Sequence, residues 1–447
     1  MIRVKFVSRI LFSTSILLLI LSISCKQEQV SKEFKPTNAH ELYIYSLEQA
    51  NLQNSVLYKR FEQASVDALT KALLIPIPYS EIFYIDHTNP DAYGYRFSLK
   101  KGQKLNVKAE LLANDSLGLF IDVFRIKDTA NTSWYKVSSS SEDSLYLEFV
   151  VRRNAEYILR IQPELLCDVQ CKVEIEIESS MHFPVLGLNK NSIQSFFGDP
   201  RDGGKRDHHG VDIFAARNTD VITSADGYIT RTGNSKIGGK YVWTYYPSLR
   251  INCYYAHLET ISIKNRQKVK AGTKIGTVGN SGNAKYTPPH LHFGIYQSGL
   301  GPVDPYYFIA TDNLKSGKIS ERLEMFGNLA RTNSGKVLLY SNNRVFELPS
   351  NSSLNICAIN STKFRVKLPD GRIGFIDINQ IEVSDKPIIV GTNSKLANLY
   401  NTPDEGALII MDQINVDQID FLSKFNNYYF VRLGSGRTGW LSSKEII

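Results

Sequence analysis

Apolar side chains in residues 41–73 recur at steps of three to five residues, the spacing that places them on one face of an α-helix. The stretch contains neither proline nor glycine. Pro76 and Pro78 follow soon after, and proline lacks the backbone N–H that a continuing helix needs. We therefore predict one or two helices within a segment that spans residues 41–75.

A different pattern follows these prolines. Residues 81–178 contain short apolar runs separated by turn-forming residues. In the last run, Val173, Ile175 and Ile177 alternate with glutamates, as in a strand with one buried and one solvated face. The six runs are residues 93–99, 104–111, 119–125, 145–151, 157–162 and 172–178. This pattern predicts an antiparallel β-sandwich as an accessory domain over residues 76–181.

The C-terminal part of the chain contains a repeat. Residues 364–376 align with residues 429–441, and each copy reads as a strand, a glycine-containing turn and a second strand. Two strands joined in this way form a hairpin. Short strand-like runs precede each copy, so we predict two small β-barrels, at residues 313–385 and 386–447. Together with the preceding segments, this indicates a mainly β, multidomain protein.

The N-terminus has the features of an export signal. Arg3, Lys5 and Arg9 precede an apolar run at residues 10–20, which is shorter than a membrane span. No other run approaches the roughly 18 apolar residues that a spanning helix needs. We therefore expect residues 1–24 to be a signal peptide and the rest of the chain to be exported.

A cysteine follows this signal. Ser24 precedes Cys25, and a small residue before a cysteine resembles the lipobox of bacterial lipoproteins. The resemblance implies cleavage after Ser24 and a lipid on Cys25 that anchors the protein to a bacterial membrane. Residues 25–40, which are largely polar, would then form a tether. The alternatives are a plain signal peptide with an incidental cysteine, or an uncleaved anchor.

Composition and charge narrow the class of protein. The chain has 447 residues, of which 43% are hydrophobic and 21% charged, as in globular proteins of two to four domains. Loss of residues 1–24 would lower the formal net charge from +8 to +5, because the segment carries three basic residues and no acid. This mild excess favours anionic surfaces such as wall polymers. No nucleic-acid-binding motif accompanies it.

Two of the remaining cysteines are close in sequence. Cys167 and Cys171 could form a disulfide in an oxidising periplasm. They could equally be two small buried side chains, and the sequence leaves both interpretations open.

Two histidine motifs suggest a metal site. His208 and Asp212 belong to a His-x-Gly-x-Asp motif, and His290 and His292 to a His-x-His motif. On a strand, residues two apart point to the same face, so His290 and His292 would be neighbours. Three imidazole or carboxylate ligands with a fourth position left open suit a catalytic Zn²⁺.

A fifth residue adds to this chemistry. His257 ends the run Tyr254-Tyr-Ala-His257 and precedes a polar turn. If three residues hold the zinc, His257 and one histidine of the His-x-His motif remain free. Free imidazoles can orient water, move its proton and donate a hydrogen bond to the oxyanion of a tetrahedral intermediate.

Taken together, these motifs resemble the M23 family of zinc endopeptidases, the lysostaphin-like and LytM-like enzymes, over residues 183–308. The matching segments are residues 203–215, 225–227, 255–258, 269–276, 278–283, 288–294 and 302–305. The resemblance implies a peptidase domain at residues 182–312 that binds one Zn²⁺ per chain. It further implies that His208, Asp212 and His292 are the zinc ligands and that His257 and His290 are catalytic. His209 occupies a variable position of the motif and is expected at the rim.

The chain departs from the usual family pattern at three places. Tyr245-Tyr246-Pro247 stands where many relatives carry another histidine. The loop at residues 283–289 is longer than the commonest form and should shape substrate access. Gly294 replaces the usual glutamate after the His-x-His motif.

The resemblance also implies a function. Members of this family hydrolyse peptide crosslinks of peptidoglycan, and the C-terminal repeats resemble the bacterial SH3-like domains that bind peptidoglycan in wall hydrolases. We therefore expect a peptidoglycan endopeptidase of the D,D type. The alternatives are a catalytically silent regulator of other hydrolases and a surface protease that acts on glycine-rich proteins. The helical segment at residues 41–73 could also cover the cleft and inhibit it.

Overall fold

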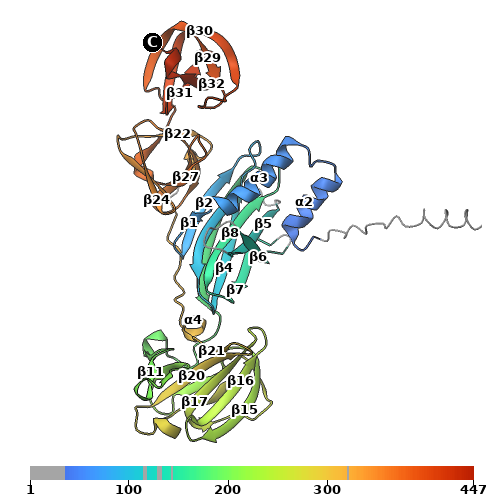
Figure 1. The fold of residues 1–447 in the computed structure, drawn as a ribbon, viewed down its shortest axis with the longest axis vertical. Helices are drawn as coiled ribbons and strands as arrows, with labels where there is room; N and C mark the ends of the chain where they lie inside the picture. The colour runs from blue at the N-terminus through green and yellow to red at the C-terminus, as the bar shows by residue number, and fades with distance from the viewer. Residues whose placement is uncertain (1–35, 114–117, 128–132, 142–143, 320–321, 447) are drawn as a thin grey trace, which may run out of the picture. The chain divides into compact units, whose positions relative to one another are not determined.

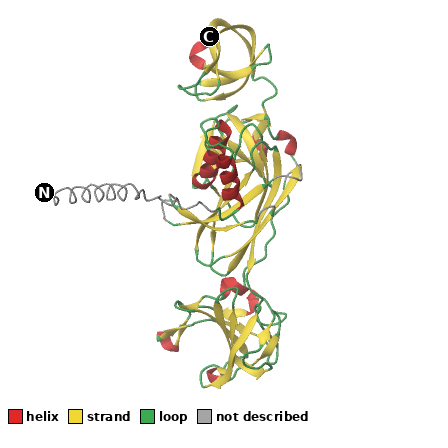
Figure 2. Cartoon of the chain, turned by 90° about the vertical axis from the view of Figure 1, so that its right-hand side faces the viewer, coloured by secondary structure: helices red, strands yellow, loops and turns green. Residues whose placement is uncertain are grey.

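A computed structural model describes residues 36–446 apart from 114–117, 128–132, 142–143 and 320–321 (Figure 1). Cys25, the expected signal peptide and most of the expected tether lie outside the described residues. Strands dominate the fold, which confirms the predicted mainly β class (Figure 2). Contacts divide the chain into Met1–Thr37 and Asn38–Ile447. Within the described part of the chain, no helix is both long and apolar enough to cross a membrane.

The predicted helical segment consists of two helices, α2 (Ala39–Gln49) and α3 (Val56–Thr70). Each begins at a residue whose side chain accepts a hydrogen bond from a backbone N–H of the first turn, Asn38 for α2 and Ser55 for α3. Between them the chain turns through Asn51, whose φ of 58° is incompatible with a continuing right-handed helix.

The following strands form two facing sheets. One sheet has the order β1 (Leu73–Leu74), β3 (Tyr93–Leu99), β8 (Ala155–Pro163), β5 (Leu119–Ile126) and β6 (Trp134–Ser139). The other contains β2 (Tyr79–Ile85), β9 (Val169–Ser179), β4 (Gln103–Ala113) and β7 (Tyr146–Val150). Side chains such as Phe83, Tyr95 and Leu159 form the core between the sheets. Each of the six predicted strands overlaps one of these strands.

The sequence pattern missed β2 and β6. Nearly every residue of β2 is buried, so its polarity does not alternate, and every residue of β6 is half-buried, so no apolar face stands out. Cys167, in the loop before β9, and Cys171, within β9, are both free thiols. The disulfide that the sequence allowed is therefore not formed here.

The sheet that contains β2 continues into the C-terminal part of the chain. Its further strands are β22 (Leu329–Thr332), β23 (Val337–Ser341), β24 (Arg344–Leu348), β25 (Ser353–Ile359), β26 (Lys363–Lys367), β27 (Ile373–Asp377) and β28 (Ile381–Val383). β25 pairs with β2 through Ile82 and Ile359. A buried ion pair between Glu81 and Arg365, 3.2 Å apart, joins the same two regions.

The last strands form a closed barrel of β29 (Ile389–Tyr400), β30 (Ile409–Phe425), β31 (Tyr428–Leu433) and β32 (Thr438–Ser442). Both hairpins predicted from the repeat are confirmed, as the antiparallel pairs β26–β27 and β31–β32. The two copies differ in context, because the first belongs to a sheet shared with β2 and the second closes on itself.

The histidine-rich region forms a separate antiparallel sheet, visible in Figure 1 around β15, β16, β17 and β20. Its main order is β10 (Ile193–Ser195), β13 (Val211–Phe214), β20 (His290–Gln297), β17 (Ile251–Ile261), β16 (Gly239–Tyr246), β15 (Gly227–Ser235) and β18 (Lys268–Val269). Three short strands also belong to this sheet, β14 (Asp220–Ile222), β19 (Lys274–Val278) and β21 (Gly301–Val303). In the same region β11 (Pro200–Arg201) and β12 (Arg206–Asp207) form a two-stranded sheet of their own, and the helix α4 (Tyr306–Ile309) follows β21.

Strand alternation gives this sheet two chemically different faces. Val242, Tyr246 and Phe293 are fully buried in the core on one face. Residues one position away, such as Trp243 and His292, lie on the other face and are half-buried. The histidine motifs therefore lie on the face that is open to solvent.

Candidate metal centre

The register between β13 and β20 places the two motifs against each other. Asp212 stands directly opposite His292, and Phe214 directly opposite His290. Residues opposite each other in an antiparallel pair have Cβ atoms about 4.5–5.5 Å apart, close enough for their side chains to share a ligand. Strand pairing alone thus joins residues that are 80 positions apart in the sequence.

His208 reaches the same point from a loop rather than from a strand. The loop follows β12, and Gly210 leads from it into β13. A Cβ atom on Gly210 would lie 2.6 Å from the carbonyl oxygen of Phe293 and 2.8 Å from Cε1 of His292. Only glycine therefore allows the backbone to approach His292 this closely.

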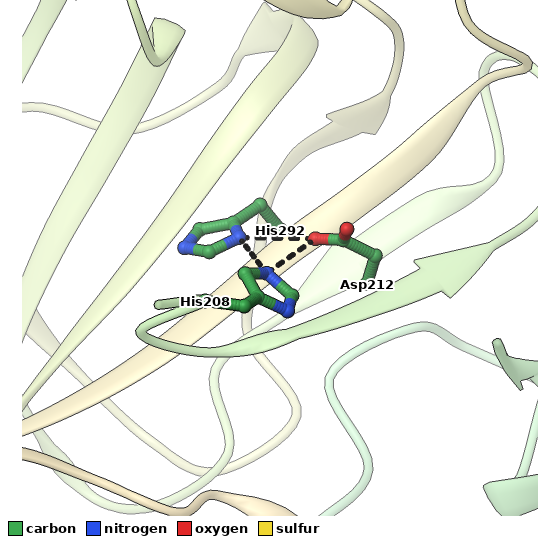
Figure 3. Close-up of side chains that lie close together, drawn as sticks. All are labelled: His208, Asp212 and His292. Carbon is green, nitrogen blue, oxygen red and sulfur yellow. Dashed lines mark hydrogen bonds and ion pairs between the residues drawn. The ribbon is translucent and has the colours of Figure 1, made fainter. Parts of the chain in front are cut away.

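His208, Asp212 and His292, named here the cleft cluster, point their polar atoms toward one another (Figure 3). His208 Nε2 lies 3.0 Å from His292 Nδ1 and 3.1 Å from Asp212 Oδ1. His292 Nδ1 lies 3.0 Å from Asp212 Oδ1. The three atoms form a nearly equilateral triangle.

Hydrogen bonding alone does not account for this triangle. His208 Nδ1 lies 2.8 Å from the carbonyl oxygen of Phe196 and donates to it, so His208 Nε2 carries a lone pair when the ring is neutral. Asp212 Oδ1 is also an acceptor. One proton on His292 Nδ1 can satisfy only one of these two neighbours. The arrangement therefore concentrates lone pairs at one point, as a cation site does.

The donor set and its spacing fit zinc. Two ligand atoms about 2.0–2.1 Å from one tetrahedral zinc ion lie about 3.3 Å apart, close to the separations in the cleft cluster. Burial lowers the pKa of His292, which favours the neutral ring that binds metals. Burial alone would raise the pKa of Asp212, but hydrogen bonds with His208 and His292 lower it well below its ordinary value. Asp212 is therefore a carboxylate.

A residue that the sequence did not single out holds the second oxygen of this carboxylate. Arg201 Nη2 donates to Asp212 Oδ2 at 2.7 Å and to Ser195 Oγ at 2.6 Å. Hydrogen-bond partners of this kind orient metal-binding residues. Nothing in the local sequence marks Arg201, because its approach to Asp212 depends on how the β11–β12 hairpin folds over β13.

A β-bulge directs His257 toward the cleft cluster. β16 pairs Lys240 with Leu258 and Val242 with Tyr255, so two residues of β17 stand opposite one residue of β16. His257 lies within this bulge and has a φ of 61°, an unusual value for a residue with a side chain. Bulges commonly redirect side chains next to functional sites.

His257 and His290 are held in the same way. Nδ1 of His257 donates to the carbonyl oxygen of Ser281 at 2.9 Å, and Nδ1 of His290 donates to that of Pro288 at 2.9 Å. Each bond leaves Nε2 as the ring atom available to a ligand. Burial lowers the pKa of His257 to about 4, so its ring is neutral at pH 7. The ring centroid of His257 lies 5.1 Å from the ring centroid of His290 and 6.0 Å from that of His292.

All five predicted site residues line one cleft of about 510 Å³. Asn283, Ala284 and Thr287 line it too, so the long loop at residues 283–289 forms part of its wall. His209 is exposed at the cleft and is not part of the cleft cluster.

Aromatic side chains extend from the cleft along the open face of the sheet. Trp243 stands opposite Tyr254 with ring centroids 4.6 Å apart, and Tyr296 lies 5.1 Å from Trp243. Tyr255, one position along from Tyr254, is instead fully buried in the core, and its hydroxyl lies 2.6 Å from that of Tyr246.

A second group of metal-ligand residues lies elsewhere, at the ends of β2 and β9. Asp86, His87 and Asp168, named here the surface cluster, also have polar atoms within 4.8 Å of one another. His87 and Asp168 are exposed, and their side chains form an ion pair of 3.0 Å. Asp86 Oδ1 already accepts hydrogen bonds from the backbone and hydroxyl of Thr88.

Comparison with known proteins gives matches in the region that contains the cleft cluster. The chain is 36% identical over 129 residues to L-Ala--D-Glu endopeptidase of Bacillus subtilis (strain 168), covering 26% of this chain and 37% of that protein. It is 37% identical over 92 residues to peptidoglycan DD-endopeptidase ShyA of Vibrio cholerae, covering 21% of each. It is 33% identical over 114 residues to murein hydrolase activator NlpD of Escherichia coli, covering 25% of this chain and 28% of that protein.

These matches therefore span well under half the length of each relative. Among solved structures, the catalytic domain of the antimicrobial peptidase lysostaphin from Staphylococcus simulans is 31% identical, with a TM-score of 0.24 over 26% of this chain and 92% of that chain. Residues 206–305 match Peptidase family M23. The resemblance seen in the motifs is thus confirmed, and the chain contains a Peptidase family M23 domain.

Proposed function

We propose that this chain is a zinc-dependent endopeptidase that hydrolyses peptide crosslinks of peptidoglycan. One observation carries the proposal: the cleft cluster lies in the same cleft as two further histidines whose Nδ1 atoms are tied to backbone carbonyls. The choice of peptidoglycan as the substrate is supported by the relatives. Two of them are named as endopeptidases, and one of those two as acting on peptidoglycan.

In this proposal His208, Asp212 and His292 hold the zinc ion. A zinc ion with an open coordination position polarises a carbonyl group and lowers the pKa of water to about 7. Arg201 keeps the Asp212 carboxylate oriented by its hydrogen bond to Oδ2. The half-buried aromatic side chains Trp243, Tyr254 and Tyr296 limit the access of bulk water along one side of the cleft.

His257 and His290 handle the proton and the developing charge. Because Ser281 fixes the proton of His257 on Nδ1 and the ring is neutral at pH 7, Nε2 of His257 accepts the proton of the attacking water. Pro288 fixes His290 in the same tautomer. The imidazole of this pair that carries the water proton donates a hydrogen bond to the oxygen that gains negative charge during attack on the amide, and passes the proton to the amide nitrogen when the bond breaks.

We also propose that the protein acts outside the cytoplasm. The N-terminal sequence supports this proposal. A positively charged segment and then an apolar run precede Cys25, which is the proposed site of the lipid anchor. The C-terminal β units, which resemble SH3-like domains, would bind the wall and bring the cleft to its substrate. A wall-bound enzyme that is also tethered to the membrane has a raised effective concentration at its substrate.

The test is muropeptide release from purified peptidoglycan by the full chain and by His290→Ala, with His182→Ala as the matched control. His182 is exposed and lies outside the cleft. We expect crosslinked dimers to disappear with the parent chain and with His182→Ala, and to disappear at least about a hundredfold more slowly with His290→Ala. A chelator should stop the reaction and zinc should restore it.

No release by zinc-loaded parent chain would overturn the proposal. The result would favour a catalytically silent regulator, a role that the similarity to a murein hydrolase activator keeps open. Cleavage of glycine-rich peptides in preference to muropeptides would instead favour a surface protease.

A further inference from the structure

The charges along the cleft bear on which peptides it accepts. Two arginines, Arg201 and Arg206, line it, and Asp212 is the one carboxylate among its described lining residues. The two oxygens of Asp212 are engaged, Oδ1 by the cleft cluster and Oδ2 by Arg201. A bound divalent cation would add further positive charge.

The β11–β12 hairpin fixes where these arginines lie. Arg201 stands directly opposite Arg206, and Pro200 opposite Asp207. Side chains that stand opposite each other in an antiparallel pair lie on the same face. Because Arg201 contacts Asp212, Arg206 flanks the cleft cluster as well, whereas the alternation of the strand turns Asp207 to the other face.

Placing two like charges directly opposite each other is unfavourable unless anions compensate for them. Asp212 compensates Arg201. Arg206 is exposed to the solvent of the cleft and takes part in an interaction of its own. A guanidinium has five N–H donors in a planar fork, so it can keep one partner and still hold a carboxylate with two parallel hydrogen bonds.

We propose that Arg206 is a specificity-determining residue that binds a free carboxylate of the substrate peptide close to the bond to be cut. The cleft then prefers peptides with an acidic residue or a free carboxyl terminus at that position over neutral peptides such as glycine bridges. The inference rests on the proposed function for the identity of the substrate, but the charge preference itself concerns binding and not turnover.

The test measures binding, so it does not depend on hydrolysis. The ligands are two crosslinked stem-peptide dimers that differ only in whether the carboxyl groups beside the crosslink are free or amidated. The protein is the zinc-loaded full chain with His290→Ala, alone and combined with Arg206→Gln, Arg206→Lys or Arg206→Glu, studied by calorimetry. Zinc content is measured for each variant, because an unchanged content shows that the cleft cluster is intact.

We expect the His290→Ala chain to bind the free-carboxylate dimer at least about fivefold more tightly than the amidated one. Arg206→Gln should abolish the preference, Arg206→Lys should retain part of it, and Arg206→Glu should reverse it. Lys205→Gln is the matched control: Lys205 is an exposed cation next to Arg206 that does not line the cleft, so the preference should remain.

Equal binding of the two dimers, binding of neither, or a preference that survives Arg206→Gln would each overturn the inference. An equal loss on Lys205→Gln would also overturn it, because a general positive field would then explain the preference. If the preference follows Arg206 but the parent chain cleaves neither dimer, the proposed function fails and the inference stands.

Discussion

The cleft cluster and the surface cluster contain the same kinds of side chain but differ in their surroundings. Each combines histidine and aspartate with ligand atoms within 4.8 Å of one another. In the cleft cluster His208 and Asp212 are buried, whereas in the surface cluster His87 and Asp168 are exposed. Proximity of ligand atoms is thus common to both, and burial is not.

The second difference lies in the partners of each polar atom. In the cleft cluster, Phe196 binds Nδ1 of His208 and Arg201 binds Oδ2 of Asp212. Nε2 of His208 and Oδ1 of Asp212 are left turned toward one another. In the surface cluster, Thr88 and the backbone of His87 already satisfy the carboxylates. The comparison teaches that a metal site needs unsatisfied, oriented donors, and four predictions test this.

The largest effect is expected from His292→Ala, which removes one of the three proposed zinc ligands. Zinc affinity should fall by about a hundredfold or more, because the large binding free energy of a protein zinc site comes from only a few ligands. The matched variant, His87→Ala, should leave zinc affinity and stoichiometry unchanged. Competition with a chromogenic chelator measures both. Loss of zinc on His87→Ala would erase the distinction between the clusters.

Gly210→Ala tests whether close packing is needed to bring His208 to His292. The added Cβ would meet the Phe293 carbonyl and the His292 ring, so the free energy of unfolding should fall by about 1–3 kcal/mol and zinc binding should weaken. Gly335→Ala is the control, since nothing lies within 4 Å of a Cβ there. Urea denaturation with and without zinc measures the effect, and equal stability of the two variants would contradict the prediction.

Arg201→Met probes the orientation of Asp212. Zinc affinity should fall by about tenfold, since partners of metal ligands typically contribute a factor of 10 to 100. Arg206→Met, on the same hairpin, should bind zinc normally because Arg206 is not the residue that contacts Asp212. Equal zinc affinity of both variants and the parent chain would show that Asp212 needs no such support.

The smallest effect concerns the surface cluster itself. The hydrogen bond and the charge of Asp168 raise the pKa of His87 above 6.5. A raised pKa in the folded state means that this pairing stabilises the protein fully below pH 6.5 and not at all once the pH exceeds the folded pKa. Titration of the His87 ring by NMR should show the upward shift, and Asp168→Asn should abolish it. Addition of zinc should leave the His87 resonance unchanged.

Local patterns in the sequence predicted much of the molecule. The alternation of Val173, Ile175 and Ile177 predicted a strand of the sandwich, and the spacing of apolar residues predicted the helical segment. The two aligned repeats predicted both C-terminal hairpins. These features depend on neighbours in the chain, since the periods of helix and strand come from backbone geometry. β2 was missed because it is buried on both faces and shows no period.

The motifs also named the five residues of the candidate site, and the order of those motifs identified the family. Residue types alone could not show how the five come together. Pairing Asp212 with His292 requires the register of β13 and β20, which is fixed by burial of a whole strand face and not by any one residue. The bulge that directs His257 into the cleft arises from a mismatch between β16 and β17.

The sequence by itself therefore determined which five side chains are candidates for the site, and that His290 and His292 share one face of a strand. The tertiary structure decided that Arg201 holds Asp212, that Arg206 faces the cleft, and that Asp168 meets His87 in the surface cluster. The physical reason is the range of the interactions. Periodicity is set within a few residues, whereas register, burial and the direction of a hydrogen bond are set by strands that meet only when the chain has folded.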